Sequence, residues 1–248
     1  MMARRLAFAI VVVVLAALAG PVDAQPLLAD LFKHRITIDS GFTGADVLLY
    51  GALDGKGDVV IVVRGPEERV VVRRKDRVAG LWINVDDVEF TGVPAFYAVA
   101  ANRPIEDIVR RSFRGLHQIG LTSIRLDTAD ARPDEEIEPF REALLRNRVR
   151  DGLFTGEVGK VEFPGETLFR TLVHFPAEVT EGNYSAQIFL IRDGVEISAE
   201  TIPLYVNKTG FQAEVNYWAH KQPAIYGLAA ILLALFAGWI AAVAFRKG

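Results

Sequence analysis

The stretch Asp58–Arg64 reads Asp-Val-Val-Ile-Val-Val-Arg, and it decides the fold class of this chain of 248 residues. Its five consecutive β-branched residues favour an extended strand, because branching at Cβ suits a pleated sheet better than a helix. Turn signals bound the stretch on both sides: residues 54–57 read Asp-Gly-Lys-Gly and residues 65–66 read Gly-Pro. We expect 54–57 to close a β-hairpin, since glycine supplies the positive φ that hairpin turns require.

Similar short runs recur before and after this stretch, again separated by turn residues such as Arg192-Asp193-Gly194. Many short strands at this spacing are typical of a β-sandwich or a barrel. We therefore predict a mainly β protein with two immunoglobulin-like β-sandwich regions and a helical segment between them. The expected strands span 35–39, 46–51, 58–64, 69–74, 88–90, 96–100, 168–175, 184–192 and 195–206.

Apolar residues change to a helical period between the two β regions. Over 104–119 this spacing predicts one amphipathic helix with Pro104 in its first turn. A second helix is expected over 138–150, with Pro139 at its start. Gly152 is expected to stop it, because glycine readily adopts the left-handed conformation that ends helices.

The two ends of the chain carry signals for export and anchoring. The apolar run 6–18 follows two arginines and suits the core of a signal peptide, with cleavage after Ala24; an uncleaved anchor is the alternative. Residues 224–245 are uncharged and overwhelmingly apolar, and as a helix they would cover roughly 33 Å, enough to span a bilayer. Basic residues lie before the signal core and after the anchor, so the positive-inside rule places the chain between them outside the cytoplasm.

These boundaries divide the chain into seven predicted parts. The bulk is expected in the periplasm, with a single-pass anchor in the inner membrane and the C-terminus in the cytoplasm. The parts are a signal peptide 1–24, a β-sandwich 25–103, a helical segment 104–152, a second, smaller β-sandwich 153–208, a juxtamembrane segment 209–223, a transmembrane helix 224–245 and a cytoplasmic tail 246–248.

The sequence contains no recognisable catalytic pattern. Cysteine is absent, which removes disulfides, thiolate ligands and thiol nucleophiles, and a net charge of −3 gives no field that implies nucleic acid. The four histidines lack the spacing of a helical metal site, and no serine lies in a nucleophile elbow. Asp86, Asp87 and Glu89 form a carboxylate cluster that we interpret as a solvated turn. We expect no cofactor, no metal and no enzymatic activity.

Two basic groups are candidate contact surfaces. On a strand, Arg69, Arg73 and Lys75 point to the same side, since side chains alternate between the two faces. On the first predicted helix, a second basic group lies opposite the apolar stripe. Either face is a candidate for contact with anionic lipid, an acidic ligand or a partner protein. The second group consists of Arg110, Arg111 and Arg114.

The predicted anchor carries a stripe of small residues at every fourth position. Small residues allow a second helix to approach closely, and in lipid such packing replaces the hydrophobic drive that water supplies. We interpret the stripe as a site of association with itself or with another membrane helix. It consists of Ala230, Ala234, Gly238 and Ala242.

Several segments stand in a characteristic order along the mature chain. In the first half they include 42–45 (Phe-Thr-Gly-Ala), 80–84 (Gly-Leu-Trp-Ile-Asn) and 94–100 (Pro-Ala-Phe-Tyr-Ala-Val-Ala); in the second, 208–211 (Lys-Thr-Gly-Phe) and 237–239 (Ala-Gly-Trp). With these segments the chain resembles an alphaproteobacterial family described as putative transmembrane protein, which has no established activity. The resemblance implies a periplasmic domain with an inner-membrane anchor and hints at transport, and it brings no catalytic residues.

The function expected from these observations is a non-catalytic interaction or accessory module. Its partners are the lipid bilayer and a membrane protein, with a permease as one candidate, or a second copy of the chain. A solute-binding accessory domain is the alternative, favoured by a basic pocket lined by Arg73 or Arg110. A membrane-tethered hydrolase is a third, favoured by a pocket where His34, His174 and carboxylates converge.

The signal-peptide prediction has a direct test. Because Val22 and Ala24 occupy the two small-residue positions that signal peptidase requires, the mature chain should begin at Gln25. N-terminal sequencing of protein purified from membranes measures this. Recovery of Met1 or Met2 on the mature chain would replace the predicted topology with two membrane helices.

Overall fold

The computed structural model describes residues 26–78, 80–208 and six further positions at 227, 231, 234, 235, 238 and 239, all helical. Strands dominate these residues, which confirms the prediction of a mainly β protein. The predicted signal peptide 1–24, juxtamembrane segment 209–223 and tail 246–248 lie outside the described residues. So does the predicted span 224–245 apart from the six positions, and its spanning role stays a prediction.

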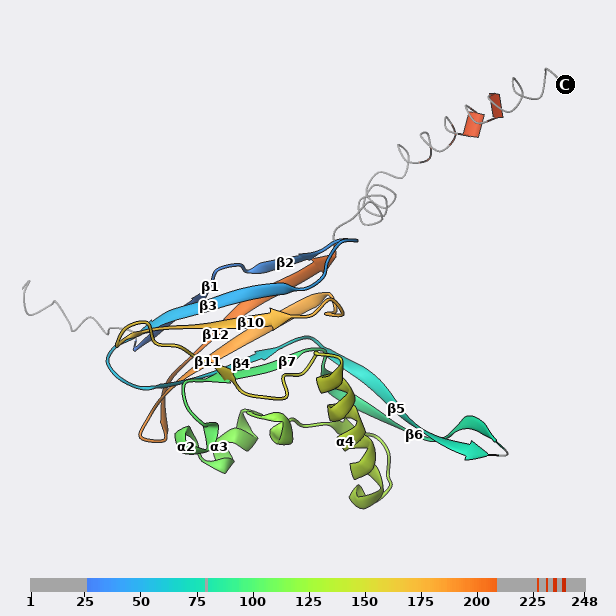
Figure 1. Cartoon of the computed structure of the whole chain (residues 1–248), viewed down its shortest axis with the longest axis horizontal. Helices are drawn as coiled ribbons and strands as arrows, with labels where there is room; N and C mark the ends of the chain where they lie inside the picture. Colours follow the sequence, from blue (N-terminus) through green and yellow to red (C-terminus); the bar gives the residue numbers. More distant parts are fainter. Residues whose placement is uncertain are drawn as a thin grey trace, which may run out of the picture.

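The described strands form three sheets, whose arrangement is drawn in Figure 1. A three-stranded sheet has the order β1-β3-β10, formed by β1 (Leu27–Leu31), β3 (Ala45–Leu53) and β10 (Leu168–Phe175). A six-stranded sheet has the order β2-β12-β11-β4-β7-β9, formed by β2 (Arg35–Ile38), β12 (Val195–Lys208), β11 (Gly182–Arg192), β4 (Asp58–Arg64), β7 (Tyr97–Ala101) and β9 (Gly159–Lys160). The third sheet has the order β5-β6-β8, formed by β5 (Glu67–Val78), β6 (Leu81–Pro94) and β8 (Asp127–Thr128).

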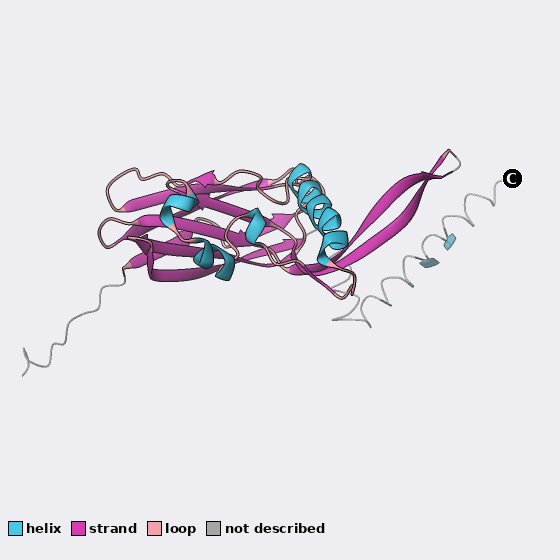
Figure 2. Cartoon of the chain, turned by 90° about the horizontal axis from the view of Figure 1, so that it is seen from below, coloured by secondary structure: helices cyan, strands magenta, loops and turns pink. Residues whose placement is uncertain are grey.

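Helices lie against one side of the six-stranded sheet (Figure 2). They are α2 (Ile105–Ile108), α3 (Arg111–Leu116), a 3₁₀ turn (Leu121–Ser123) and α4 (Asp134–Arg150). Their apolar residues share one core with Val60 and Val62 of β4. The other face of β4 presents Val59, Ile61 and Val63 to a second core, shared with the β1-β3-β10 sheet. The five residues are at most 3% exposed, so β4 is the central strand between two cores.

The two predicted sandwich regions are not separate in the structure. Strand β10 pairs with β3 over eight positions, and β11 pairs with β4 over seven. The ring of Phe96 stacks on Phe175 at 4.6 Å and lies 6.1 Å from Tyr184, so aromatic packing also joins the two ranges. Strands β10, β11 and β12 of the second range therefore form one sandwich with β1 to β4 of the first, because their apolar residues share one buried core. The immunoglobulin-like form that was predicted for each range is not confirmed.

Of two predicted turns, the one at 54–57 is not a hairpin, and the one at Asp193 and Gly194 is. The loop 54–57 closes no hairpin, since β3 and β4 belong to different sheets and the loop crosses between them. The turn at Asp193 and Gly194 does join a paired hairpin, with φ of 52° and 77° at the two residues. These values suit a two-residue turn of the primed type. A turn signal thus fixes where the chain bends, while the packing of apolar faces decides which strand it meets.

Two helix predictions are corrected. The helix expected over 104–119 is broken into α2 and α3, because Val109 and Arg110 are extended with ψ of 145° and 157°. The break leaves the side chain of Val109 only 3% exposed. It packs in the core that the helices share with Val60 and Val62, which we call the helix-side core. The helix expected from 138 begins at Asp134, where three acidic residues suit the positive end of the helix dipole, and Pro139 lies inside it. Gly152 ends it with φ of 72°, as expected.

The joint sandwich predicts a specific disulfide. Leu48 of β3 lies directly opposite Leu172 of β10, and paired Cα atoms in antiparallel strands are about 4.5–5.5 Å apart, within disulfide range. Because the natural chain has no cysteine, L48C/L172C should form an intramolecular disulfide upon oxidation. Migration on a non-reducing gel, with peptide mapping, measures it.

The matched control moves one cysteine along the same strand. In L48C/L168C the second residue is four positions out of register, since Leu168 lies opposite Ala52. The separation is then roughly 13 Å, too far for a disulfide. Two independent sandwiches would give no preference between the two variants, and equal oxidation would contradict the shared sheet.

Candidate interaction site

Strands β5 and β6 form a long two-stranded ribbon that projects from the body of the protein (Figures 1 and 2). We call β5, β6 and the turn between them the arm. Its pairing runs from Glu67 opposite Pro94 to Val78 opposite Leu81. Twelve residues of strand span about 40 Å, so the arm is similar in length to the longest strands of the sandwich, β11 and β12. The sequence predicted only 69–74 and 88–90 as strand and so missed most of the arm.

The base of the arm is part of the helix-side core. Val72, Val88 and Phe90 are at most 9% exposed and pack in this core with residues of α4. The short strand β8 pairs with β6 at Phe90 and Thr91 and covers its edge there. The base is thereby packed into the body of the protein.

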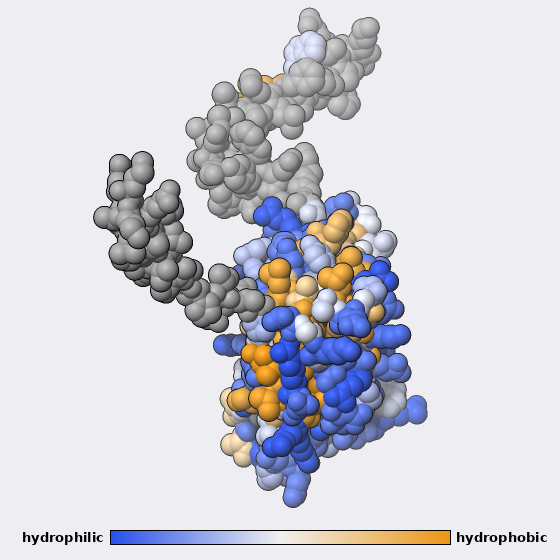
Figure 3. All heavy atoms as spheres, turned by 90° about the vertical axis from the view of Figure 1, so that its left-hand side faces the viewer, coloured by the Kyte–Doolittle hydropathy of each residue, from blue (hydrophilic) through white to orange (hydrophobic). Residues whose placement is uncertain are grey.

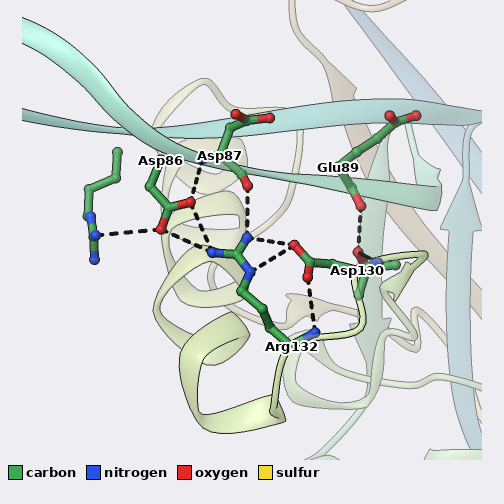
Figure 4. A network of polar contacts seen from close by, with 7 residues as sticks. Asp86, Asp87, Glu89, Asp130 and Arg132 are labelled. Carbon is green, nitrogen blue, oxygen red and sulfur yellow. Dashed lines mark hydrogen bonds and ion pairs between the residues drawn. The ribbon is translucent and has the colours of Figure 1, made fainter.

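An arginine next to α4 braces the arm further out (Figure 4). Nη1 of Arg132 lies 2.9 Å from Oδ1 of Asp86, and its Nη2 lies 2.6 Å from Oδ2 of Asp130. Nη2 also donates to the carbonyl oxygen of Asp87 at 2.8 Å. Hydrogen bonds from Arg132 hold the pKa of the Asp130 carboxyl below its ordinary value. We call Arg132, Asp130 and Asp86 the brace.

The brace corrects the interpretation of the carboxylate cluster. Asp86, Asp87 and Glu89 lie within strand β6, not in a solvated turn. Asp86 faces the side of the arm where Arg132 and Arg74 reach it, at 2.9 and 3.5 Å. The sequence could not show this, because the arginine that neutralises Asp86 is 46 residues further along the chain.

Helix α4 supports the arm through two more contacts. The ring of Phe140 has the guanidinium carbon of Arg132 at 5.6 Å and that of Arg74 at 5.9 Å, both within cation–π range. Near the other end of the helix, Arg148 forms an ion pair with Glu68 at the base of the arm. Burial lowers the pKa of Arg148 below its ordinary value. These contacts and the brace together fix the orientation of the arm relative to α4.

Beyond the brace, the arm exposes large apolar side chains. Leu81 is 70% exposed and Trp82 is 69% exposed, and Val78, Ile83 and Val85 are all more than 40% exposed. We call these five residues the tip. The opposite end of the sandwich, seen in Figure 3, also shows hydrophobic patches among hydrophilic ones. The tip differs because it lies at the end of a projecting ribbon.

The structure retains the expected arrangement of the first predicted basic group but not of the second. Arg69, Arg73 and Lys75 are exposed on β5, while Val70 and Val72 alternate with them and contribute to the core, so the expected facing is present. None of the three forms an ion pair within the described residues. Arg110, Arg111 and Arg114 do not share one helix, since Arg110 precedes α3, and Arg114 is paired with Glu106 at 2.7 Å.

The predicted anchor stripe is only partly described. Ala234 and Gly238 are helical and exposed. Ala230 and Ala242 lie outside the described residues. Association through the stripe stays a prediction.

A polar cleft of about 570 Å³ lies beside the base of the arm, and the sequence did not indicate it. Its arginines are Arg64 and Arg125, not the expected Arg73 or Arg110. Arg64 donates to Oε1 of Gln187 at 2.5 Å and to main-chain carbonyls, with no carboxylate partner among the described residues. Burial lowers its pKa, as desolvation disfavours a cation.

The three histidines that the structure describes form no common centre, and His220 lies outside the described residues. His34 contacts Asp30 at 2.8 Å and His174 contacts Asp46 at 2.7 Å. Of the three described histidines, only His117 lines the polar cleft. Within the part of the chain that the structure describes, no three potential metal-ligating side chains come together.

These features define a mainly β protein with a braced, projecting arm. The chain belongs to the family described as Putative transmembrane protein (Alph_Pro_TM), whose model matches residues 26–247. The resemblance inferred from the sequence is thereby confirmed, and membership associates the chain with membranes. Among the residues described, no helix combines the length and the apolar character needed to cross a membrane.

Other comparisons add little. Among curated proteins, no sequence matches this chain. One similar chain comes from a solved structure described as "Structural basis of T cell specificity and activation by the bacterial superantigen toxic shock syndrome toxin-1". It is 6% identical with a TM-score of 0.28, and the match covers 74% of this chain and 99% of that chain. A likeness at this level carries no conclusion about fold or function.

The brace predicts a local loss of protection when Arg132 is replaced. In R132Q, the ion pairs with Asp86 and Asp130 are lost, so backbone amides of 73–75 and 84–88 should exchange with deuterium faster than in the natural protein. R146Q is the matched control, because Arg146 is exposed on the neighbouring helix α4 and forms no ion pair among the described residues. Equal exchange in R132Q and R146Q would contradict the brace.

Acid should reproduce the effect of R132Q. The pKa of Asp130 is lower in the folded protein than its ordinary value of 3.8, so the stabilisation is present above pH 3.8. It is lost as the pH falls through the folded-state pKa, when the carboxyl becomes protonated. The difference in exchange between R132Q and the natural protein should therefore shrink in acid.

Proposed function

We propose that this chain is a membrane-anchored, non-catalytic interaction module that works docked at the membrane. The observation that carries the proposal is the tip of the arm. Leu81 and Trp82 are about two-thirds exposed, yet they belong to an arm that several side chains hold in place. Exposed apolar surface of this kind commonly marks an interaction site.

The tip does not contribute to the stability of the sandwich. The described arm residues that pack in the core end at Val72 on β5 and Val88 on β6. The exposed indole and aliphatic groups beyond them therefore gain little from folding and are available for a partner. A braced arm also loses little conformational freedom upon contact, which favours binding.

The order of the strands supports a single immunoglobulin-like sandwich. In that fold, one sheet contains strands A, B and E, and the other contains G, F and C. Here β1-β3-β10 faces β12-β11-β4, with β2 parallel to β12 at one side and β7 beyond β4 at the other. If β1, β3 and β10 correspond to A, B and E, then β12, β11 and β4 correspond to G, F and C. The arm then follows strand C, which is β4. The fold alone does not define a function, but such sandwiches commonly serve recognition.

Family membership and the apolar segment 224–245 support the remaining topology. We propose a cleaved signal peptide, a periplasmic sandwich, one anchor in the inner membrane and a cytoplasmic tail. The anchor keeps the module near the bilayer, where a membrane protein such as a permease, or a second copy of the chain, is its partner. One anchor by itself forms no conventional transport path.

A solute-binding accessory domain is the second candidate, and the cleft at Arg64 favours it. A half-buried guanidinium without a carboxylate partner suits a small anion, and Arg125 also lines the cleft. Glu67 and Asp127 also line the cleft and offset this charge. Stabilisation of the full chain by inorganic phosphate, lost in R64M, would favour this candidate. The hydrolase is less supported, since His34 and His174 do not line the cleft.

Docking through the arm predicts protection of the tip in native membranes. A single cysteine introduced by L81C should react severalfold more slowly with a membrane-impermeant maleimide than one introduced by V195C. Val195 is 61% exposed and begins β12, whereas the arm leaves from the end of the sheet where β12 finishes. Labelling of the full chain in membrane preparations, followed by mass spectrometry, measures both rates.

The same two variants in detergent provide the control. Removal of the membrane should make L81C react as quickly as V195C, because both positions are then exposed to solvent. Equal rates in native membranes would show that nothing covers the tip, and the proposed function would then be wrong.

A further inference from the structure

The arm leaves the sandwich at the end from which the chain continues toward its predicted anchor. Strand β12 is antiparallel to β11, and β11 is antiparallel to β4, so β12 and β4 run in the same direction. Their last residues, Lys208 and Arg64, therefore lie at the same end of the sheet, and the arm begins just after Arg64. Figure 1 shows the arm, β5 and β6, leaving from one end of the sandwich.

The chain between the sandwich and the predicted span limits how far apart they can be. Residues 209–223 separate Lys208 from the apolar segment and reach at most about 50 Å when fully extended. The arm itself is about 40 Å long. A bilayer that holds the anchor is therefore within reach of the tip.

The chemistry of the outer arm suits the boundary between lipid headgroups and acyl chains. Arg77 lies opposite Trp82 across the ribbon, so a cation and an indole share one face. Val78 and Leu81 form the next pair. Tryptophan favours the headgroup level, aliphatic groups favour the region below it, and lysine or arginine attracts lipid phosphates.

The net positive charge of the outer arm also favours contact with an anionic bilayer. Beyond the ion pair of Arg74 with Asp86, β5 carries Lys75 and Arg77 against one carboxylate, Asp76. None of these three forms an ion pair within the described chain. The outer arm therefore presents a cationic and apolar surface, complementary to an anionic bilayer.

We propose that the tip of the arm inserts into the interfacial layer of an anionic lipid bilayer. This proposal rests on the proposed docking function and names the surface that the arm contacts. A narrow ribbon exposed on both faces suits insertion among lipids better than the flat surface of a protein interface. Two membrane contacts, the arm and the anchor, then fix the orientation of the sandwich and leave its other surfaces for a partner protein.

The test uses the purified full chain in vesicles without any other protein. A nitroxide is attached through L81C in one sample and through V71C in another, since Val71 is 44% exposed but lies nearer the base of the arm, on the paired strand β5. In vesicles of phosphatidylcholine with phosphatidylglycerol, the label at position 81 should be shielded from a water-soluble nickel reagent and accessible to oxygen. The label at position 71 should show the opposite pattern.

Two substitutions test the role of charge. In K75Q/R77Q, the ratio of inserted to water-exposed label at position 81 should fall about 30-fold on the anionic vesicles, since each cation contributes roughly 1 kcal/mol near an anionic surface. On pure phosphatidylcholine, the same substitutions should have little effect. R110Q/R111Q is the matched control, because both arginines are exposed but lie outside the arm.

The outcomes separate this proposal from the proposed function. Shielding of position 81 in pure vesicles supports insertion into lipid. Protection in native membranes without shielding in pure vesicles would identify a protein as the occupant, overturning the lipid proposal and leaving the docking function intact. Absence of protection in both would overturn both proposals.

Discussion

The fold depends on the burial of strand β4 on both of its faces. Its side chains alternate between the core beneath the β1-β3-β10 sheet and the core beneath the helices, and none of Val59 to Val63 is more than 3% exposed. A strand in this position must have a neighbour on each edge and a cover on each face. Strands β11 and β7 supply the edges, and this requirement brings together segments more than 100 residues apart.

The arm follows from where β4 ends. The chain leaves the sheet after Arg64, buries Val72 and Phe90 against the helix-side core, and then continues beyond that core. Charged groups hold it where apolar packing stops, through Arg132 and Arg74, which both contact the ring of Phe140. An ion pair at a partly exposed site contributes modest stability, but several in one place fix a direction.

The direction in which the arm projects relates the structure to the membrane association of the family. The exit of the arm and the exit of the chain toward 224–245 share one end of the sandwich, since β4 and β12 run the same way. The surface at that end combines Trp82 with Lys75 and Arg77, while the polar cleft at Arg64 lies beside the base. A module with two contacts to one bilayer would have a defined orientation, which a single anchor by itself does not provide.

The sequence by itself determined the elements whose signals are local. The β-branched run of β4, the turn at Asp193 and Gly194, the stop at Gly152 and the membrane family could all be inferred, because each depends on neighbouring residues or on segments in order. Only the tertiary structure decided that the two β regions share sheets, that Val109 breaks a helix, and that Arg132 braces Asp86. These depend on contacts between residues far apart in the chain, and alternation along a strand shows which face is apolar but not what covers it.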